Sequence, residues 1–287
     1  MEQKRIWYRQ GETLLHEMRD TSVPTGFSAL WYLGQAGFAV KTGEMLCFFD
    51  PVFADLTAPD GSTRRYYPAP FAPEAAAQTG VKYVFCTHDH ADHLQPGTVG
   101  PLAKAAPSVK IVVPAPFVDK VIGLGAAPEQ VIGAKAEEPI ALPDGSTVIP
   151  IPAAHEQYET DENGNHKALS YLLITPDGRK IFDAGDTIAT EELMERLQKE
   201  NGIDCAMLPI NGADNKRRRS NIIGNMNSRE AADLACDINA DLVIPCHYDM
   251  TFGNGEQASH FADYMDCYYS GRKYHMMQLG ERIWLSR

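Results

Sequence analysis

Short apolar segments bounded by turn residues recur along the whole chain. Segments rich in aromatic and β-branched residues predict buried strands, because such side chains pack well in a pleated sheet. Segments with apolar residues at helical spacing predict helices instead. Strands are expected at 30–33, 38–40, 45–49, 81–87, 110–113, 147–151, 170–174, 180–183, 205–209 and 242–245. Helices are expected at 6–18, 102–106, 117–124, 191–200 and 228–238.

The order of these elements indicates the fold class. Thr175-Pro176-Asp177-Gly178 predicts a tight hairpin turn, and Asn227 followed by Glu230 predicts a capped helix start. Strands and helices alternate elsewhere, which favours two packed sheets with helices outside, an α/β fold (α+β in some classifications). We expect a single domain over 1–287, with an N-terminal helix at about 6–18 and a core at about 28–287.

Composition is that of a soluble globular protein. Of 287 residues, 44% are hydrophobic and 22% are charged. No apolar run approaches the roughly 18 residues that cross a bilayer, and residues 1–8 have no hydrophobic signal region. The six cysteines are scattered without a C-x-x-C pair. We therefore expect a cytoplasmic protein with reduced thiols and no membrane association.

Net charge argues against one class of partner. At −12 the chain is acidic, whereas nucleic-acid binding depends on a basic surface that neutralises phosphates. We expect no nucleic-acid partner. The run Lys216–Arg219 is the exception to this acidic trend.

The densest chemistry lies in His88–His93, directly after a predicted buried strand. A junction between strand and helix is a common place for chemistry on a rigid scaffold. His88 and His90 are two residues apart, so in extended backbone they face the same way. Asp92 and His93 follow the turn and can reach a second ion. Imidazole and carboxylate ligands suit zinc, manganese or ferrous iron.

Three further polar residues follow apolar runs: His155, Asp186 and His247. Each alone is more simply explained as a structural histidine or a turn aspartate. Taken together with His88–His93, they indicate a shared metal site.

The order H-x-H-x-D-H, then His, Gly-Asp and His, resembles the metallo-β-lactamase superfamily over residues 30 to about 250. The resemblance implies a four-layer αβ/βα sandwich with two divalent metal ions, zinc or manganese, with iron as the alternative. By this resemblance one ion is held by His88, His90 and His155. The other is held by Asp92, His93 and His247, and Asp186 bridges the two ions.

Within the superfamily, four segments (31–37, 87–93, 185–187 and 244–249) resemble the branch of the L-ascorbate-6-phosphate lactonases. This implies a metal-dependent hydrolase that uses a metal-bound hydroxide on a small anionic substrate, such as a sugar-phosphate lactone or another carboxylic ester. It also implies a homo-oligomer. The chain is shorter than the lactonases and lacks their long insertions, so the substrate stays open.

Other residues have expected roles near the metals. Asp92 is expected to orient the attacking water and to take its proton. Asp50 is either an acceptor for the N–H of a metal-binding histidine or a turn residue. Asp89 either orients a histidine or caps the next helix.

The basic run lies in a predicted loop that also contains Asn211, Asp214 and Asn225. Two metal ions and two carboxylates would leave a positive site that favours an anionic substrate. Arg217 or Arg219 is expected to contact that anion, while Lys216 and Arg218 are expected to be solvated.

Three alternatives remain. A phosphodiesterase or nuclease of the same fold would cleave a phosphodiester but no lactone. A diiron redox protein usually has Glu where His90 stands. A non-catalytic scaffold would tolerate replacement of Asp92 by Ala without loss of any turnover.

Overall fold

The computed structural model describes residues 6–57 and 60–286, which form two compact units. The first unit contains the chain up to Ala134, Met250–Phe252 and the stretch from Gln278 onward. The second contains Lys135–Asp249 and Gly253–Met277. The predicted single domain over 1–287 included residues 1–5, 58–59 and 287, which lie outside the described residues. One domain across the whole chain stays a prediction.

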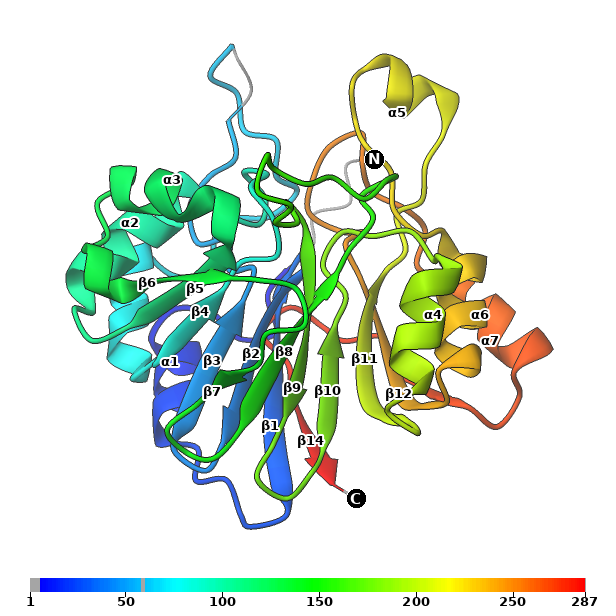
Figure 1. The fold of residues 1–287 in the computed structure, drawn as a ribbon, viewed down its shortest axis with the longest axis horizontal. Coiled ribbons are helices and arrows are strands. Elements are labelled where there is room, and N and C mark those ends of the chain that lie inside the picture. The colour runs from blue at the N-terminus through cyan, green and yellow to red at the C-terminus, as the bar shows by residue number, and fades with distance from the viewer. Residues whose placement is uncertain (1–5, 58–59, 287) are drawn as a thin grey trace. The chain divides into compact units, whose positions relative to one another are not determined.

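The sheet of the first unit has the strand order β14-β1-β2-β3-β4-β5-β6 (Figure 1). Strands β14 to β3 pair antiparallel, and β3 to β6 pair parallel. Every residue of β3 is buried, as expected for an uninterrupted apolar run. The bounds are β1 (Phe27–Gly34), β2 (Gly37–Thr42), β3 (Met45–Phe49), β4 (Tyr83–Phe85), β5 (Lys110–Pro114), β6 (Val131–Ala134) and β14 (Arg282–Ser286).

The first helix begins later than the pattern predicts. This helix, α1, spans Gly11–Asp20, whereas the prediction was 6–18. It buries Leu14, Leu15 and Met18. The indole of Trp7 donates to the carbonyl of Pro68, and the Tyr8 amide donates to the carbonyl of Leu279. These long-range bonds hold the preceding residues in a non-helical path. The other helices of this unit are η1 (Pro73–Thr79), α2 (Pro96–Ala105), η2 (Ala115–Phe117), α3 (Val118–Gly123) and η3 (Pro128–Gln130).

The sheet of the second unit has the strand order β13-β12-β11-β10-β9-β8-β7. Strands β7 to β10 pair antiparallel, and β10 to β13 pair parallel. The predicted hairpin turn is confirmed, since the Gly178 amide donates to the Thr175 carbonyl at 2.8 Å. The bounds are β7 (Ile140–Ala141), β8 (Thr147–Pro152), β9 (Leu169–Ile174), β10 (Lys180–Asp183), β11 (Ile203–Pro209), β12 (Ala240–Cys246) and β13 (Lys273–Tyr274).

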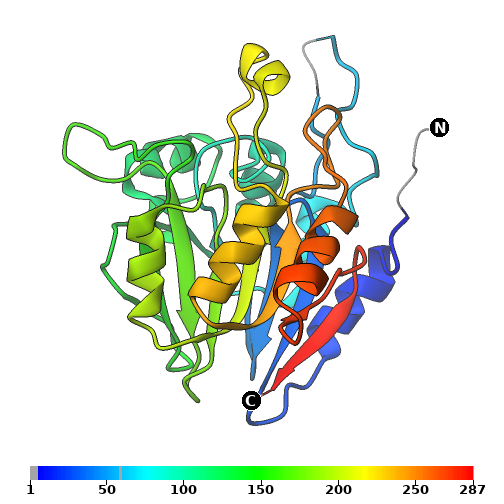
Figure 2. The ribbon, with the colours of Figure 1, turned by 90° about the vertical axis from the view of Figure 1, so that its right-hand side faces the viewer.

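Three helices cover one face of this second sheet (Figure 2). They are α4 (Glu191–Gln198), α6 (Ser228–Asp237) and α7 (Ser259–Tyr268). Their buried residues, among them Leu197, Leu234 and Phe261, form a core with Phe182 and Val243 of the strands. The predicted cap of α6 is confirmed, because Asn227 and Glu230 bond each other's backbone amides. The α/β prediction of two sheets with helices is therefore confirmed.

Several elements differ from the prediction. The basic run was expected as a loop, but it forms the short helix α5 (Asn215–Arg219), because the Asp214 carboxylate accepts from the amides of Lys216 and Arg217. Helix α7 and strand β14 have no counterpart in the predicted elements. Among the described residues, no helix combines the length and apolar character needed to cross a bilayer.

Candidate metal centre

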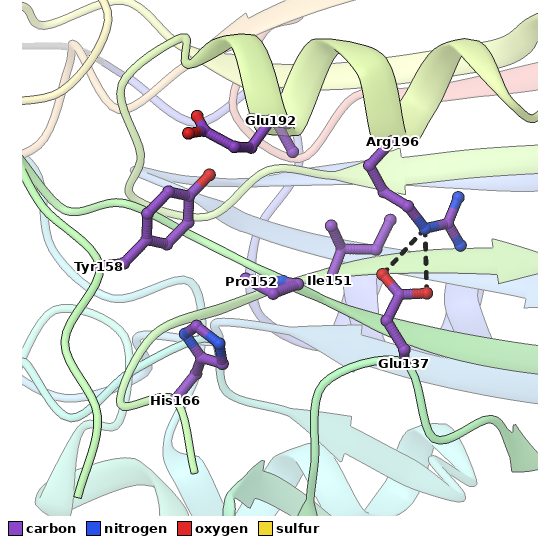
Figure 3. Close-up of a pocket in the computed structure, with 8 residues that line it drawn as sticks. Glu137, Ile151, Pro152, Tyr158, His166, Glu192 and Arg196 are labelled. Carbon is purple, nitrogen blue, oxygen red and sulfur yellow. Dashed lines mark hydrogen bonds and ion pairs between the residues drawn. The ribbon is translucent and has the colours of Figure 1, made fainter. Parts of the chain in front are cut away.

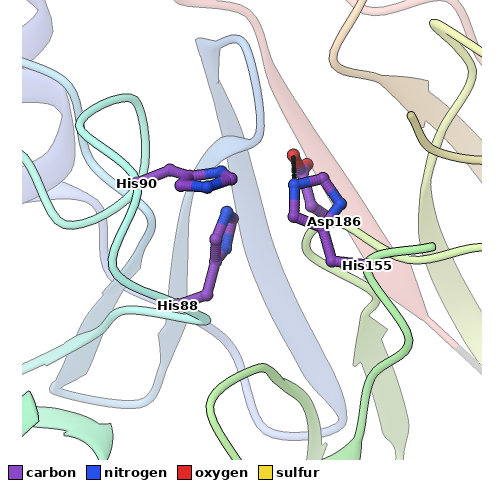
Figure 4. Close-up of side chains that lie close together, drawn as sticks. All are labelled: His88, His90, His155 and Asp186. Carbon is purple, nitrogen blue, oxygen red and sulfur yellow. Dashed lines mark ion pairs between the residues drawn. The ribbon is translucent and has the colours of Figure 1, made fainter. Parts of the chain in front are cut away.

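Four of the seven predicted metal ligands belong to the first unit, in the loop between β4 and α2. We call His88, His90, Asp92 and His93 the first-unit cluster. The ring centroids of His88 and His90 are 4.5 Å apart (Figure 4), and those of His88 and His93 are 4.2 Å apart. The loop therefore brings its three imidazoles together, in agreement with their short spacing in the sequence.

A buried carboxylate orients one of these imidazoles. Asp50, directly after β3, accepts a hydrogen bond from His93 Nδ1 at 2.6 Å, and both side chains are fully buried. Asp50 also accepts from the amide of Thr87 at 2.8 Å and from its hydroxyl at 2.6 Å. The contact with a histidine N–H that the sequence suggested for Asp50 is present. Thr87, whose Oγ1 is also 3.1 Å from His88 Nδ1, was missed as a positioning residue.

A second positioning residue, Gln35, was also missed. Its Nε2 donates to Asp92 Oδ2 at 2.7 Å, and His93 Nε2 lies 3.9 Å from the same oxygen. Gln35 is buried and has a φ of 59°, in the turn between β1 and β2. Its only signal in the sequence is its place within segment 31–37.

The other three predicted ligands belong to the second unit. We call His155, Asp186 and His247 the second-unit cluster; they follow the ends of β8, β10 and β12. His155 Nε2 lies 3.6 Å from Asp186 Oδ2 (Figure 4). His247 Nε2 lies 3.1 Å from Asp186 Oδ1. The Asp186 carboxylate thus directs one oxygen toward each imidazole.

Local backbone structure fixes this second-unit cluster. His247 has a φ of 59°, a left-handed conformation that costs free energy in a non-glycine residue. The loops after β8 and β10 are joined by two bonds: the Ala154 amide donates to Thr187 Oγ1 at 3.1 Å, and the Ile188 amide donates to the Ala154 carbonyl at 2.9 Å. The residues next to His155 and Asp186 are therefore tied directly to each other.

The remaining predicted residues lie in networks of their own. The Asp89 carboxylate pairs with Lys120 Nζ at 2.9 Å on the surface, in contrast to the expected contact with a histidine or a helix end. Arg217 is engaged by the Asp214 carboxylate and the Asn211 carbonyl. Arg219 is exposed, and its Nε donates to the Asn215 carbonyl.

Asn211 is fully buried, and its side chain has hydrogen-bond partners on two other segments of the second unit. Its side chain donates to Asn254 Oδ1 at 3.1 Å and accepts from Asn225 Nδ2 at 3.0 Å. Arg217 Nη1 also lies 3.2 Å from Asn254 Oδ1. These contacts give Asn211 and Arg217 a role in holding the loop around α5.

The side chains of each cluster fit a divalent metal ion. They offer imidazole nitrogens and carboxylate oxygens, the ligands of zinc, manganese and iron. His93 also makes the contact typical of a metal-binding histidine, because its second ring nitrogen donates to a buried carboxylate.

Comparison with known proteins identifies the family. Residues 47–248 match the family model described as the beta-lactamase superfamily domain. The chain belongs to the beta-lactamase superfamily.

The superfamily relatives include metal-dependent hydrolases. One from Methanoculleus marisnigri is 31% identical over 63% of this chain and 71% of its own length. A protein of Escherichia fergusonii named as a probable L-ascorbate-6-phosphate lactonase is 24% identical over 84% of this chain and 75% of its own length. The predicted resemblance to this superfamily is thus confirmed.

A solved structure confirms the fold. Igni18, a metallo hydrolase from Ignicoccus hospitalis, has a TM-score of 0.68 at 20% identity and covers 91% of this chain and 99% of its own. The α/β metallo-β-lactamase fold implied by the sequence is therefore confirmed. The chain is a metal-dependent hydrolase of this superfamily.

Proposed function

We propose that the first-unit and second-unit clusters together supply the ligands of two divalent metal ions, zinc or manganese, in a hydrolase. The observation that carries the proposal is the Asp186 carboxylate, with one oxygen toward His155 and the other toward His247. A bridging carboxylate needs this two-sided arrangement. The buried Asp50–His93 pair supports the same role for the first-unit cluster.

The bound metals would lower the pKa of a water molecule toward neutrality and polarise the bond to be cleaved. We assign to the Asp92 carboxylate the task of orienting that water and accepting its proton. Gln35 holds Asp92 Oδ2 through a hydrogen bond of 2.7 Å, which fixes the direction in which the carboxylate points.

The substrate class we propose is a small anionic ester or lactone, such as a sugar-phosphate lactone. The similarity to the protein named as a lactonase supports this class. The basic helix α5 supports the proposal that the substrate is negatively charged. The segment 210–226, which contains α5, is hydrogen-bonded to residues next to each of the three second-unit ligands.

These hydrogen bonds lie at three places, one beside each ligand. Beside His155, Glu156 Oε1 accepts from Arg218 Nε at 3.1 Å and from the Gly224 amide at 3.2 Å. Beside Asp186, the Thr187 carbonyl accepts from the Met226 amide at 3.0 Å. Beside His247, the Cys246 carbonyl accepts from the Ile210 amide at 3.1 Å.

Of the two arginines expected to contact the substrate anion, we favour Arg219 over Arg217. Arg217 is paired with Asp214, and Arg218 with Glu156. Arg219 makes no ion pair with any described residue. Its replacement by Gln should raise the KM of a phosphorylated lactone about fivefold without changing that of the unphosphorylated lactone. Lys199→Gln, at an exposed site after α4, is the control.

The test of the whole proposal begins with elemental analysis of protein purified without chelator. Two equivalents of zinc or manganese per chain are expected. Asp186→Asn should lose metal, whereas Asp241→Asn, at an exposed ion pair with Lys273, should keep it. Full metal content in Asp186→Asn would overturn the ligand assignment.

A hydrolysis screen then separates the substrate classes. Sugar-phosphate lactones, other esters, thioesters and phosphodiesters are tested on metal-loaded protein and after chelation. We expect lactone or ester turnover that chelation abolishes. Turnover of the phosphodiester alone would replace the lactone proposal by a phosphodiesterase.

Two further properties are proposed with this function. A cytoplasmic location agrees with six cysteines that form no disulfide. A homo-oligomer, as in the lactonases, is to be checked by light scattering of the purified protein.

A further inference from the structure

A pocket of about 280 Å³ lies in the second unit and contains none of the seven predicted metal ligands. Figure 3 shows the residues around it, which come from the segment between β6 and β7, from β8, from the loop that follows β8, and from α4. The lining residues are Glu137, Ile151, Pro152, Tyr158, His166, Glu192, Leu193 and Arg196. Its volume is slightly below the usual range for drug-sized ligands, so it fits a smaller molecule.

Most of the lining is apolar or aromatic. Ile151 and Leu193 are buried residues of the second-unit core, and Pro152 lies beside Ile151 (Figure 3). Tyr158 and His166 pack edge to face, with ring centroids 6.0 Å apart and an interplanar angle of 81°. This arrangement offers contact to a short apolar chain and aromatic surface to a cation.

The charges around the pocket leave one carboxylate in excess. Arg196 Nε contacts both carboxylate oxygens of Glu137, at 2.8 and 2.9 Å. Arg196 Nη1 contacts Glu200 at 2.8 Å. The Glu192 carboxylate makes no hydrogen bond or ion pair with any residue that the structure describes. The single guanidinium is therefore already neutralised, while Glu192 is not.

His166 adds an aromatic ring to this lining. Its Nδ1 is buried and has no hydrogen-bond partner among the described residues. Burial lowers the pKa of His166 and so favours its uncharged form, which does not neutralise Glu192. The Tyr158 hydroxyl is already paired with Thr190 Oγ1 at 2.7 Å.

We propose that this pocket binds a primary ammonium group carried on a short apolar chain. The ammonium group would pair with Glu192, and the chain would lie against Ile151, Pro152 and Leu193. A carboxylate or phosphate is disfavoured, because it would meet Glu192 and would have to compete with Glu137 for Arg196.

This chemistry occurs in free alkylamines and in the lysine side chain of a peptide. At pH 7 an alkylamine is protonated, so it is a poor ligand for a metal centre. Binding in the pocket can therefore be measured on metal-loaded protein.

The experiment is calorimetric titration of the metal-loaded protein at pH 7 with two probes of equal length, n-pentylammonium and 1-pentanol. We expect pentylammonium to bind about three- to fivefold more tightly than pentanol, because it gains one partly exposed ion pair. A third titration with Nα-acetyl-lysine methylamide identifies a peptide as the source if it binds more tightly than pentylammonium, and a free amine if it binds more weakly.

Variants assign the binding to this pocket. Glu192→Gln should remove the preference for pentylammonium over pentanol, whereas Glu195→Gln, exposed on the same helix, should keep it. Equal binding of the amine and the alcohol by the unmodified protein would overturn the proposal, as would an unchanged preference in Glu192→Gln or no binding of pentylammonium.

Discussion

Asp50 and His93 are 43 positions apart in the chain, yet Asp50 Oδ2 lies 2.6 Å from His93 Nδ1 with both side chains fully buried. The backbone of Asp50 has a φ of 41°, an uncommon value that directs the carboxylate to this place. This bond selects the ring orientation of His93 and makes the imidazole a stronger metal ligand.

Asp50→Asn should lower the affinity for the more weakly held metal by about 10- to 100-fold. Asparagine keeps the shape and tolerates a positive φ, but its amide cannot accept from His93 as a carboxylate does. Competition with a chromophoric chelator measures the affinity, and Asp55→Asn, at an exposed neighbouring position, is the control. Equal affinities in the two variants would show that the bond only supports the fold.

Gln35→Glu should raise the pKa of Asp92, because it places a second carboxylate where Nε2 now lies 2.7 Å from Asp92 Oδ2. A raised pKa means that Asp92 becomes charged only at higher pH. The pH at which half of the metal is released should therefore move upward by about one unit or more. Gln78→Glu, on the surface of η1, should leave that pH unchanged.

Gly34→Ala tests how tightly the turn that carries Gln35 is packed. A Cβ at Gly34 would lie 2.3 Å from the Tyr67 hydroxyl, and the Tyr67 ring is itself packed edge to face on Trp7 at 5.7 Å. Gly26 has a similar φ, +83° against +86°, but open space around its Cβ position. Urea unfolding should show a loss of roughly 1 kcal/mol for Gly26→Ala and about 1–3 kcal/mol more for Gly34→Ala. Equal losses would mean that Tyr67 moves aside freely.

Cysteine reactivity should follow burial. Cys267 is exposed, whereas Cys86 is buried, and burial together with the nearby Asp50 charge raises the pKa of the Cys86 thiol. Burial likewise raises the pKa of Cys205. Since only the thiolate reacts, peptide mass mapping after iodoacetamide treatment at pH 8 should show Cys267 modified first. Cys86 and Cys205 should react only in urea, and early modification of Cys86 would contradict the buried position.

The elements that the sequence predicted well are those whose signal is local. Strand β3 and strand β10 have the predicted bounds, because each contains an apolar run that lies between polar residues. The cap of α6 is readable for the same reason, since Asn227 and Glu230 are three residues apart. The order of histidines and aspartates likewise identified the superfamily without any structural information.

Elements with a weak local signal were missed. Strand β14 contains only one buried residue, Leu285, and exists because it pairs with β1 at the other end of the chain. Helix α5 formed where a loop was expected, because the Asp214 side chain caps the start of the basic run. The sequence pattern of this run indicated only solvated charged residues.

The sequence by itself determined the local strands, the family and the kinds of ligand available, since these depend on residue type and on short spacing. Only the tertiary structure decided which side chains orient the ligands. Gln35 donates to Asp92, 57 positions away in the chain. Asp50 accepts from both Thr87 and His93. Such contacts depend on the register of the strands and on burial, which concentrate distant polar groups where water cannot satisfy them. The spacing of residues along the chain therefore does not show which polar side chains orient the ligands.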